Sequence, residues 1–212
     1  FRHVDPKYHA KKTQDCEELG IDLWHIFENE YLDETKRKIW MSKINTKLGE
    51  LNKLGKSRKM YARKCTVKEP DPSATREFFT RTHLQGNCTS TVKLGLYYEG
   101  VLVSCMTFRK HSKYEWEIAR FSTELNTVVV GAASKLLRQF ELRYKPQMLM
   151  SFANRRWSTG HLYEELGFNL IGTTAPNYFY FKENENILYP REKFQKHKLV
   201  HLDGVDPQKS ER

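Results

Sequence analysis

Residues 115–137 read EWEIARFSTELNTVVVGAASKLL, and this stretch decides the fold. Residues 115–123 are predicted to form a strand, and residues 131–142 a helix that a turn of small residues opens. A strand that leads directly into a helix is typical of a crossover on a sheet. Together with its flanks, the stretch predicts an α+β fold with a central crossover.

The flanks supply the rest of this sheet and its helices. Before the crossover we expect a helix over 73–81 with Ser73 as its N-cap, a loop over 83–91 and a hairpin that turns at Glu99-Gly100. After the crossover we expect a strand over 147–152, a helix over 160–166 and a last strand over 177–181. This order is that of a mixed sheet flanked by helices.

The amino-terminal part is predicted to be a separate helix–strand–helix unit over 1–50. Its expected elements are a helix over 7–20 that Gly20 ends, a buried strand over 21–27 and a helix over 34–48 with Ile39, Trp40, Ile44 and Leu48 inward. We place a basic linker over 51–72, the α+β domain over 73–189 and a basic tail over 190–212, with disorder after Leu199.

The segment 51–68 contains no acidic residue. Its basic residues are Lys53, Lys56, Arg58, Lys59, Arg63, Lys64 and Lys68. Two interpretations stay open, a solvated linker and a hinge that contacts phosphate groups. In the second interpretation, the DNA-binding residues are Arg58, Lys59, Arg63 and Lys64.

The whole chain is basic, with 36 Lys and Arg against 26 Asp and Glu and a net charge of +10 over 212 residues. Such an excess favours DNA as a partner, because neutralising phosphates releases counterions; the alternative is a basic protein without that partner. The four cysteines are too far apart to signal a zinc site or a disulfide framework, which indicates a reducing compartment. No apolar run is long enough to span a membrane.

The crossover resembles the second half of the GNAT acyltransferase fold. In that family a Gly-x-Gly/Ala turn opens a helix whose amides meet the pyrophosphate of acyl-CoA, since a helix N-terminus offers unpaired N–H groups. Gly131 and Ala133 match this turn, and LYEELGF at 162–168 matches a later helix of the family; Val128 stands where the family has Arg or Gln. The resemblance implies acetyl-CoA or a related acyl-CoA as cofactor, bound by Val130, Gly131, Ala132, Ala133 and Ser134. Core packing is the other interpretation of the small residues.

Residues 75–180 are similar to the Mom family of phage DNA-modification proteins, on the motifs THLQG, EIARF, SFAN and GHLYEELGF followed by GTT. The two resemblances together imply a catalytic set of His83, Arg120, Ser151, Asn154 and Tyr163, with Tyr163 as proton donor to the leaving thiolate. Asn154 stands where the family has Asp, and an amide cannot take up a proton as a carboxylate does.

Simpler interpretations stand beside these roles. A loop histidine with an ordinary hydrogen bond explains His83 equally well, and a packed ring with its hydroxyl at the surface explains Tyr163. Arg120 is different, because a cation on a buried strand requires an anionic or carbonyl partner.

The whole chain also resembles the Hef-like homing endonucleases of phages, whose amino-terminal part is a PD-(D/E)XK nuclease. The shared motifs are KYHAKKTQDCEELGIDLWHIFENE, YARKC, HLQG, GLYYEG, RRWSTG, PNYFYF and FQKHKL. The resemblance implies that 1–50 is the end of the nuclease domain and that the carboxylates holding Mg²⁺ lie upstream of Phe1. We therefore expect no metal site within these residues, and a protein of the cytoplasm of a phage-infected bacterial cell.

Arg155, Arg156 and Trp157 come directly after the strand expected over 147–152, where a GNAT sheet opens. Two cations and an indole at this point predict phosphate contacts and stacking on a base. The alternative is an Arg–Trp stack that holds the loop to the protein itself.

Three functions follow from these observations. The first is a DNA-acting phage protein, the carboxy-terminal part of a homing-endonuclease-like enzyme whose GNAT-like domain binds DNA. The second is an acyl-CoA-dependent transferase that modifies a DNA base. The third is a non-catalytic interaction module with a degenerate GNAT core, which binds neither cofactor nor DNA.

Overall fold

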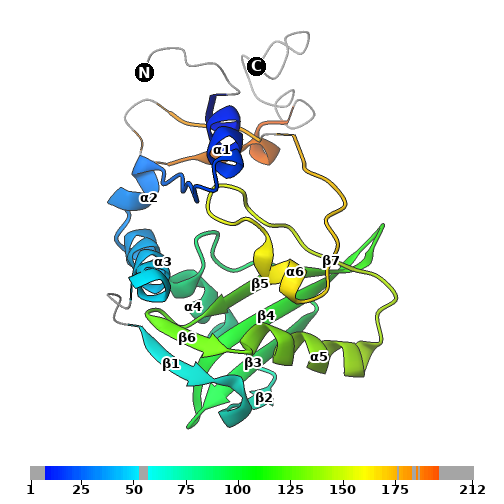
Figure 1. The fold of residues 1–212 in the computed structure, drawn as a ribbon. Helices are drawn as coiled ribbons and strands as arrows, with labels where there is room; N and C mark the ends of the chain where they lie inside the picture. Colours follow the sequence, from blue (N-terminus) through cyan, green and yellow to red (C-terminus); the bar gives the residue numbers. More distant parts are fainter. Residues whose placement is uncertain (1–7, 53–56, 176, 183–184, 186, 196–212) are drawn as a thin grey trace. The chain divides into compact units, whose positions relative to one another are not determined.

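The structure is a computed structural model, and it describes residues 8–52, 57–175, 177–182, 185 and 187–195. The chain divides into two compact units, one of Glu30–Leu170 and one of residues 1–29 with 171–212 (Figure 1). The larger unit therefore takes in the second predicted helix and the basic segment, and it ends before the predicted last strand.

The larger unit is built on a mixed five-stranded sheet of order β2-β3-β4-β5-β7. Its strands are β2 (Thr66–Lys68), β3 (Val92–Tyr98), β4 (Val101–His111), β5 (Glu115–Thr123) and β7 (Leu149–Met150). From β2 to β5, each strand is antiparallel to the next one in the sheet, whereas β7 runs parallel to β5. The parallel pairing joins only Trp116 to Leu149 and Glu117 to Met150. This mixed sheet with its helices confirms the predicted α+β class.

The hairpin between β3 and β4 turns where the sequence predicts. Glu99 and Gly100 have φ angles of 49° and 81°, and Tyr98 pairs with Val101 across the turn. Two consecutive left-handed residues match the twist of the flanking strands and set the register of a two-residue hairpin. The local sequence therefore fixes the centre of the sheet.

Helix α5 (Ala132–Tyr144) follows β6 (Thr127–Val130) and packs on β3 and β4. It begins after Gly131, whose φ of 76° is strained for residues with a side chain. The face toward the sheet is apolar and fully buried at Leu136 and Phe140. The ring of Phe140 stacks on that of Phe108 with centroids 3.7 Å apart. This packing fixes α5, and with it the start of the helix.

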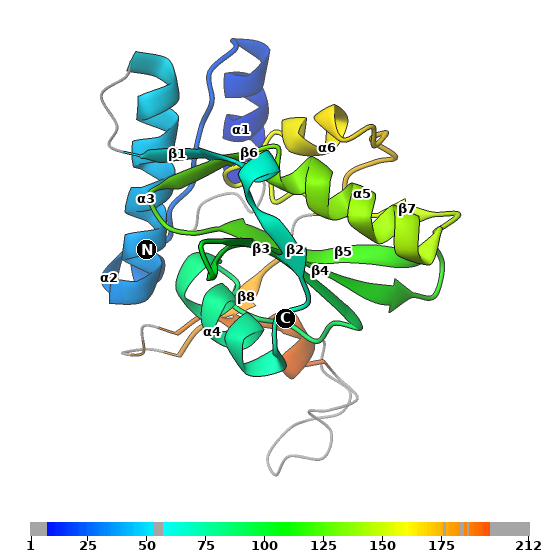
Figure 2. The same cartoon turned by 90° about the horizontal axis from the view of Figure 1, so that it is seen from below.

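Helix α4 (Pro72–Thr82) lies on the opposite face of the sheet from α5 (Figure 2). Phe78 and Phe79 are buried there against Cys105. The helix begins one residue before the predicted Ser73 cap, because Asp71 is the N-cap. Proline lacks an N–H group and has a helical φ, so Pro72 suits the first helical position.

The basic segment predicted to be a linker contains two strands. Strand β1 (Arg58–Tyr61) pairs in parallel with β6, and after the short 3-10 helix η1 (Ala62–Lys64), β2 pairs with β3. Met60, Ala62 and Cys65 are buried in the core between the cations. These apolar side chains are the reason that the segment packs on the unit.

Two further helices belong to the larger unit, α3 (Glu34–Asn52) and α6 (His161–Glu165), and α2 (Glu28–Leu32) begins two residues before that unit starts. Helix α3 is the helix predicted over 34–48. Ile39 and Trp40 are buried as predicted, whereas Leu48 is exposed. The inward face of α3 is therefore narrower than the sequence pattern predicts.

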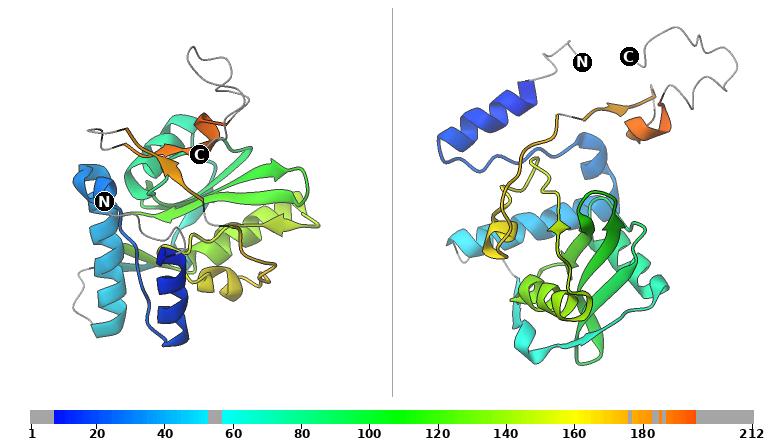
Figure 3. Two further views of the ribbon diagram at one scale, coloured as in Figure 1. Left: turned by 90° about the horizontal axis from the view of Figure 1, so that it is seen from above. Right: turned by 90° about the vertical axis from the view of Figure 1, so that its right-hand side faces the viewer.

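The smaller unit contains α1 (Tyr8–Glu18), which is the predicted first helix. Residues 21–27 are not the predicted strand: no described strand pairs with them, and Ile21 and Ile26 are exposed. The predicted last strand is shortened to β8 (Phe179–Tyr180), which pairs with β9 (Tyr189–Pro190) before the 3-10 helix η2 (Arg191–Lys193), orange in Figure 3. The disorder expected after Leu199 lies outside the described residues.

Candidate functional site

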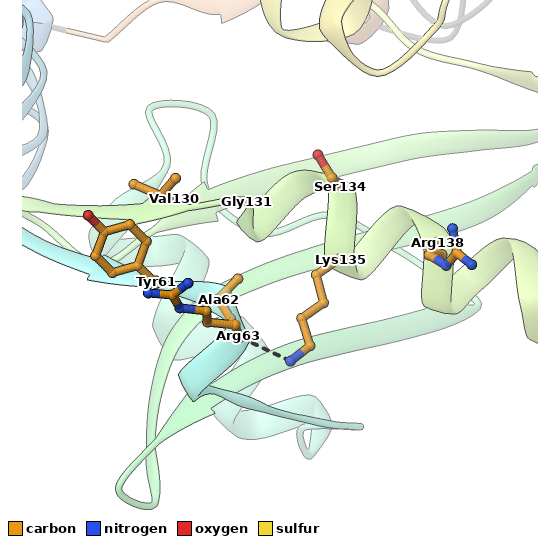
Figure 4. Close-up of a pocket in the computed structure, with 8 residues that line it drawn as sticks. All are labelled: Tyr61, Ala62, Arg63, Val130, Gly131, Ser134, Lys135 and Arg138. Atoms are coloured by element: carbon orange, nitrogen blue, oxygen red, sulfur yellow. Dashed lines mark hydrogen bonds between the residues drawn. The ribbon is translucent and has the colours of Figure 1, made fainter.

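A surface hollow of about 630 Å³ lies at the start of α5. The residues that line this α5 hollow are Tyr61, Ala62, Arg63, Val130, Gly131, Ser134, Lys135 and Arg138 (Figure 4). The first N–H groups of a helix have no partner within the helix and carry its positive dipole end. The arrangement is therefore suited to hold a phosphate group.

The five residues predicted to bind a cofactor all lie at this turn, but only some of them face the hollow. Val130, Gly131 and Ser134 line the hollow, whereas the side chains of Ala132 and Ala133 are buried in the core. A β-carbon built on Gly131 would lie 3.8 Å from that of Ala62. The structure shows core packing for Ala132 and Ala133, and cofactor binding at the turn stays a prediction.

The cations of the α5 hollow have different roles. The Nζ of Lys135 donates hydrogen bonds to the carbonyl oxygens of Ala62, at 2.9 Å, and Cys65, at 2.6 Å, and so ties η1 to α5. Arg63 and Arg138 are exposed, and neither forms an ion pair within the described part of the chain. These two guanidinium groups are therefore available to an anionic ligand.

The predicted DNA-binding residues of the basic segment lie on β1 and η1. Arg58, Lys59, Arg63 and Lys64 are all exposed. The guanidinium of Arg58 lies over the ring of Tyr98 at 5.5 Å, and that of Arg63 over Tyr61 at 5.1 Å. Together with Arg138 they form what we call the basic edge.

Arg156 and Trp157 do not face outward as the DNA-binding prediction requires. The guanidinium of Arg156 forms two hydrogen bonds with the carboxylate of Glu30, at 2.9 and 3.0 Å, and lies 4.7 Å from the indole of Trp157. Trp157 in turn packs edge-on against the buried Trp40. Arg156 and Trp157 therefore form the Arg–Trp stack that the sequence analysis gave as the alternative to DNA contact, and this stack holds the loop to the protein itself. Arg155 is exposed.

Asn154 organises the same loop. Its side-chain oxygen accepts a hydrogen bond from the backbone N–H of Arg156 at 3.1 Å, and its carbonyl accepts from Trp157 and Ser158. This is the usual role of an Asn that begins a turn. The structure therefore gives Asn154 a conformational role.

Tyr163 and Ser151 lie together near the end of β7. Burial raises the pKa of Tyr163, the nearby Ser151 side chain opposes that shift, and the carboxylate of Glu117 adds to it. The hydroxyl of Tyr163 also donates to the carbonyl of Phe152 at 3.5 Å. Glu117 itself is held by Arg109 through two hydrogen bonds of 2.8 Å. A tyrosine is protonated near neutral pH even without this shift, so the proton-donor role that the resemblance implies stays a prediction.

The sequence predicts an anionic or a carbonyl partner for Arg120, and the structure shows carbonyl partners. Its Nε donates to the carbonyl of Gly86 at 3.1 Å and one terminal nitrogen donates to that of Ala119 at 2.7 Å. It thereby joins β5 to the turn that follows His83. The Nδ1 of His83 accepts a hydrogen bond from the N–H of Gln85 at 3.1 Å.

Lys43 on α3 acts on His83 together with Arg120, and the sequence analysis did not single it out. Burial lowers the pKa of its ammonium group. Burial, Arg120 and Lys43 also lower the pKa of His83 to about 3, because each disfavours the imidazolium. A lysine on the helix face that carries Ile39 and Trp40 was the available signal.

The low pKa of His83 predicts a loss of stability in acid. An unfolded His takes up a proton near pH 6.5 and the folded one near 3, so the unfolded state binds more protons between these values and stability falls as pH falls. The variant His83→Asn keeps an acceptor for the N–H of Gln85. In urea unfolding, its free energy of unfolding should fall by about 1–2 kcal/mol less between about pH 7 and pH 5 than that of the unchanged chain. An unchanged pH dependence in this variant would contradict the assignment.

No comparison, whether with protein families, with curated proteins or with solved structures, gives a match. Among the described residues, no three His, Cys, Asp or Glu side chains are placed to hold a metal ion. No described helix is both long enough and apolar enough to cross a membrane.

Proposed function

We propose that this chain acts on DNA and contacts phosphate groups through the basic edge, at the start of α5. The observation that carries the proposal is the placement of the exposed Arg63 and Arg138 around an open helix N-terminus. Backbone amides and guanidinium groups are the usual donors to phosphate oxygens in DNA complexes. The net charge of +10 supports the same partner through counterion release.

Within this proposal the chain is the carboxy-terminal part of a homing-endonuclease-like phage protein, and its GNAT-like unit binds the DNA. The support comes from the sequence resemblance and from the sheet order, in which an antiparallel run ends in one parallel pair beside the crossover helix. We assign the contact with DNA to the basic edge and not to Arg156 and Trp157, because Glu30 already neutralises the charge of Arg156.

Fluorescence anisotropy with a labelled DNA duplex tests the proposal across a range of salt concentrations. Arg63→Gln and Arg138→Gln should each weaken binding and reduce the slope of log K against log[salt] by about 1, as expected for one lost phosphate contact. Arg143→Gln is the matched control, since Arg143 also lies on α5 but pairs with Glu69 at 2.7 Å. An affinity that barely responds to salt, or an equal effect of Arg143→Gln, would contradict the proposal.

A second candidate is an acyl-CoA-dependent transferase that modifies a DNA base. The α5 hollow favours it, because the same helix N-terminus and arginines fit the pyrophosphate of a CoA-type cofactor, which would supply an activated acyl group. Tyr163, kept protonated by burial, is the residue that would donate a proton. Asn154 counts against a base at that position, since its amide is part of a turn. Calorimetry with acetyl-CoA decides: no heat of binding at millimolar cofactor would exclude this candidate and leave the DNA proposal standing.

A further inference from the structure

Three nitrogen-bearing side chains from separate elements lie in one region of the larger unit, where α3 packs against α4 and Arg120 donates to the carbonyl of Gly86, three residues after His83. Lys43 comes from α3, His83 follows α4, and Arg120 lies on β5. The charges of both Lys43 and Arg120 act on the imidazole of His83. We call these three residues the donor cluster; none of them lines the α5 hollow.

Lys43 has the least satisfied polar group of the cluster. Its ammonium carries three N–H donors. In the described part of the chain, the one group that it contacts is the indole of Trp157, whose ring centroid lies 5.9 Å from Nζ. Neither a hydrogen bond nor an ion pair of Lys43 occurs among the described residues. A largely buried ammonium without an acceptor is unfavourable, and an anion would remove this cost.

The other two members each hold a further donor. Because Nδ1 of His83 accepts from Gln85, the proton of the neutral ring belongs on Nε2. Arg120 uses Nε and one terminal nitrogen for the carbonyls of Gly86 and Ala119, which leaves its second terminal nitrogen without a described partner. Each member of the cluster therefore offers an N–H donor, and the three donors come from separate elements.

We propose that Lys43, His83 and Arg120 form a binding site for a single phosphate group. All three side chains keep part of their surface exposed, so that a small anion can reach them. No carboxylate forms an ion pair with any of them in the described residues, and N–H donors match an anion. A tetrahedral oxyanion offers acceptors in several directions, as this arrangement of donors requires. This site is separate from the basic edge, so it stands whether or not that edge binds DNA.

NMR spectroscopy of the whole chain, titrated with inorganic phosphate, tests the site. The imidazole signals of His83 should shift with saturation in the millimolar range, and Lys43→Met should weaken this binding by about tenfold, as expected for a lost hydrogen bond to a charged group. Lys38→Met is the matched control, because Lys38 lies on the same helix but pairs with Glu34 in solvent. Its affinity for phosphate should equal that of the unchanged chain.

Further ligands identify the source of the phosphate. A dinucleotide that shifts the same signals points to the DNA backbone, and one that does not points to a free phosphate group; either result supports the site. Absence of any saturable shift of His83 in the unchanged chain would overturn it, and so would an equally large effect of Lys38→Met. The first measurement needs no variant, so a Lys43→Met chain that fails to fold leaves the test intact. Arg138→Gln should leave this response unchanged, which separates failure here from failure of the basic edge.

Discussion

Replacing Phe140 by alanine should lower the free energy of unfolding by about 3–5 kcal/mol. Phe140 is fully buried on α5 and stacks nearly parallel to Phe108, with ring planes 5° apart. The rings of Trp116 and Tyr144 also contact it, with centroids 5.1 and 5.0 Å away. Truncation would leave a cavity at the centre of the contact between helix and sheet. Urea unfolding followed by circular dichroism measures the loss.

Phe140→Leu provides the matched control, since it keeps an apolar side chain in the same place and should cost clearly less. A loss of under about 1 kcal/mol for Phe140→Ala would show that this aromatic group does not hold α5 on the sheet. Because α5 carries the α5 hollow, the same truncation should also weaken DNA binding. DNA binding by Phe140→Ala should weaken only under conditions in which part of the variant is unfolded.

The central part of the fold was predictable because its signals are local. The turn at Glu99-Gly100 and the strand β5 appear where the sequence places them, and Gly131 opens the crossover helix. Each depends on neighbouring residues only: left-handed turn positions, β-prone runs and a small-residue turn. The α+β class follows from the order of these elements.

The rest depends on contacts between distant segments. Strand β1 forms because β6, almost seventy residues later, pairs with Arg58–Tyr61 in parallel, and no pattern in the basic segment announces that partner. The opposite error occurred at 21–27, where a β-prone run has no described strand beside it. Such runs are typical of strands only where an edge is available to them.

The candidate site shows the same limit at the level of side chains. Arg156 and Trp157 have the composition of a nucleic-acid contact, but the partner that decides their role, Glu30, is remote in sequence. The spacing of Lys43 to Ile39 and Trp40 places it on the buried face of α3, but the sequence does not show what that face meets. Arg63 was predicted from charge alone, and its position beside Arg138 came only with the fold.

Replacing Glu30 by alanine should lower the free energy of unfolding by about 2–4 kcal/mol. Its carboxylate pairs with both terminal nitrogens of Arg156 and accepts a hydrogen bond from the indole of Trp40 at 3.2 Å, and only 10% of its side chain is exposed. Without it, a mostly buried guanidinium and an indole N–H lose the hydrogen bonds that they form with this carboxylate. Urea unfolding of Glu30→Ala, Arg156→Met and the double variant measures the coupling, and the double variant should be more stable than the sum of the two losses predicts. Additive losses would instead mean that the pair contributes nothing beyond its separate packing. The exposed pair of Glu34 and Lys38 is the control, and its removal should leave stability nearly unchanged, since water already solvates both charges.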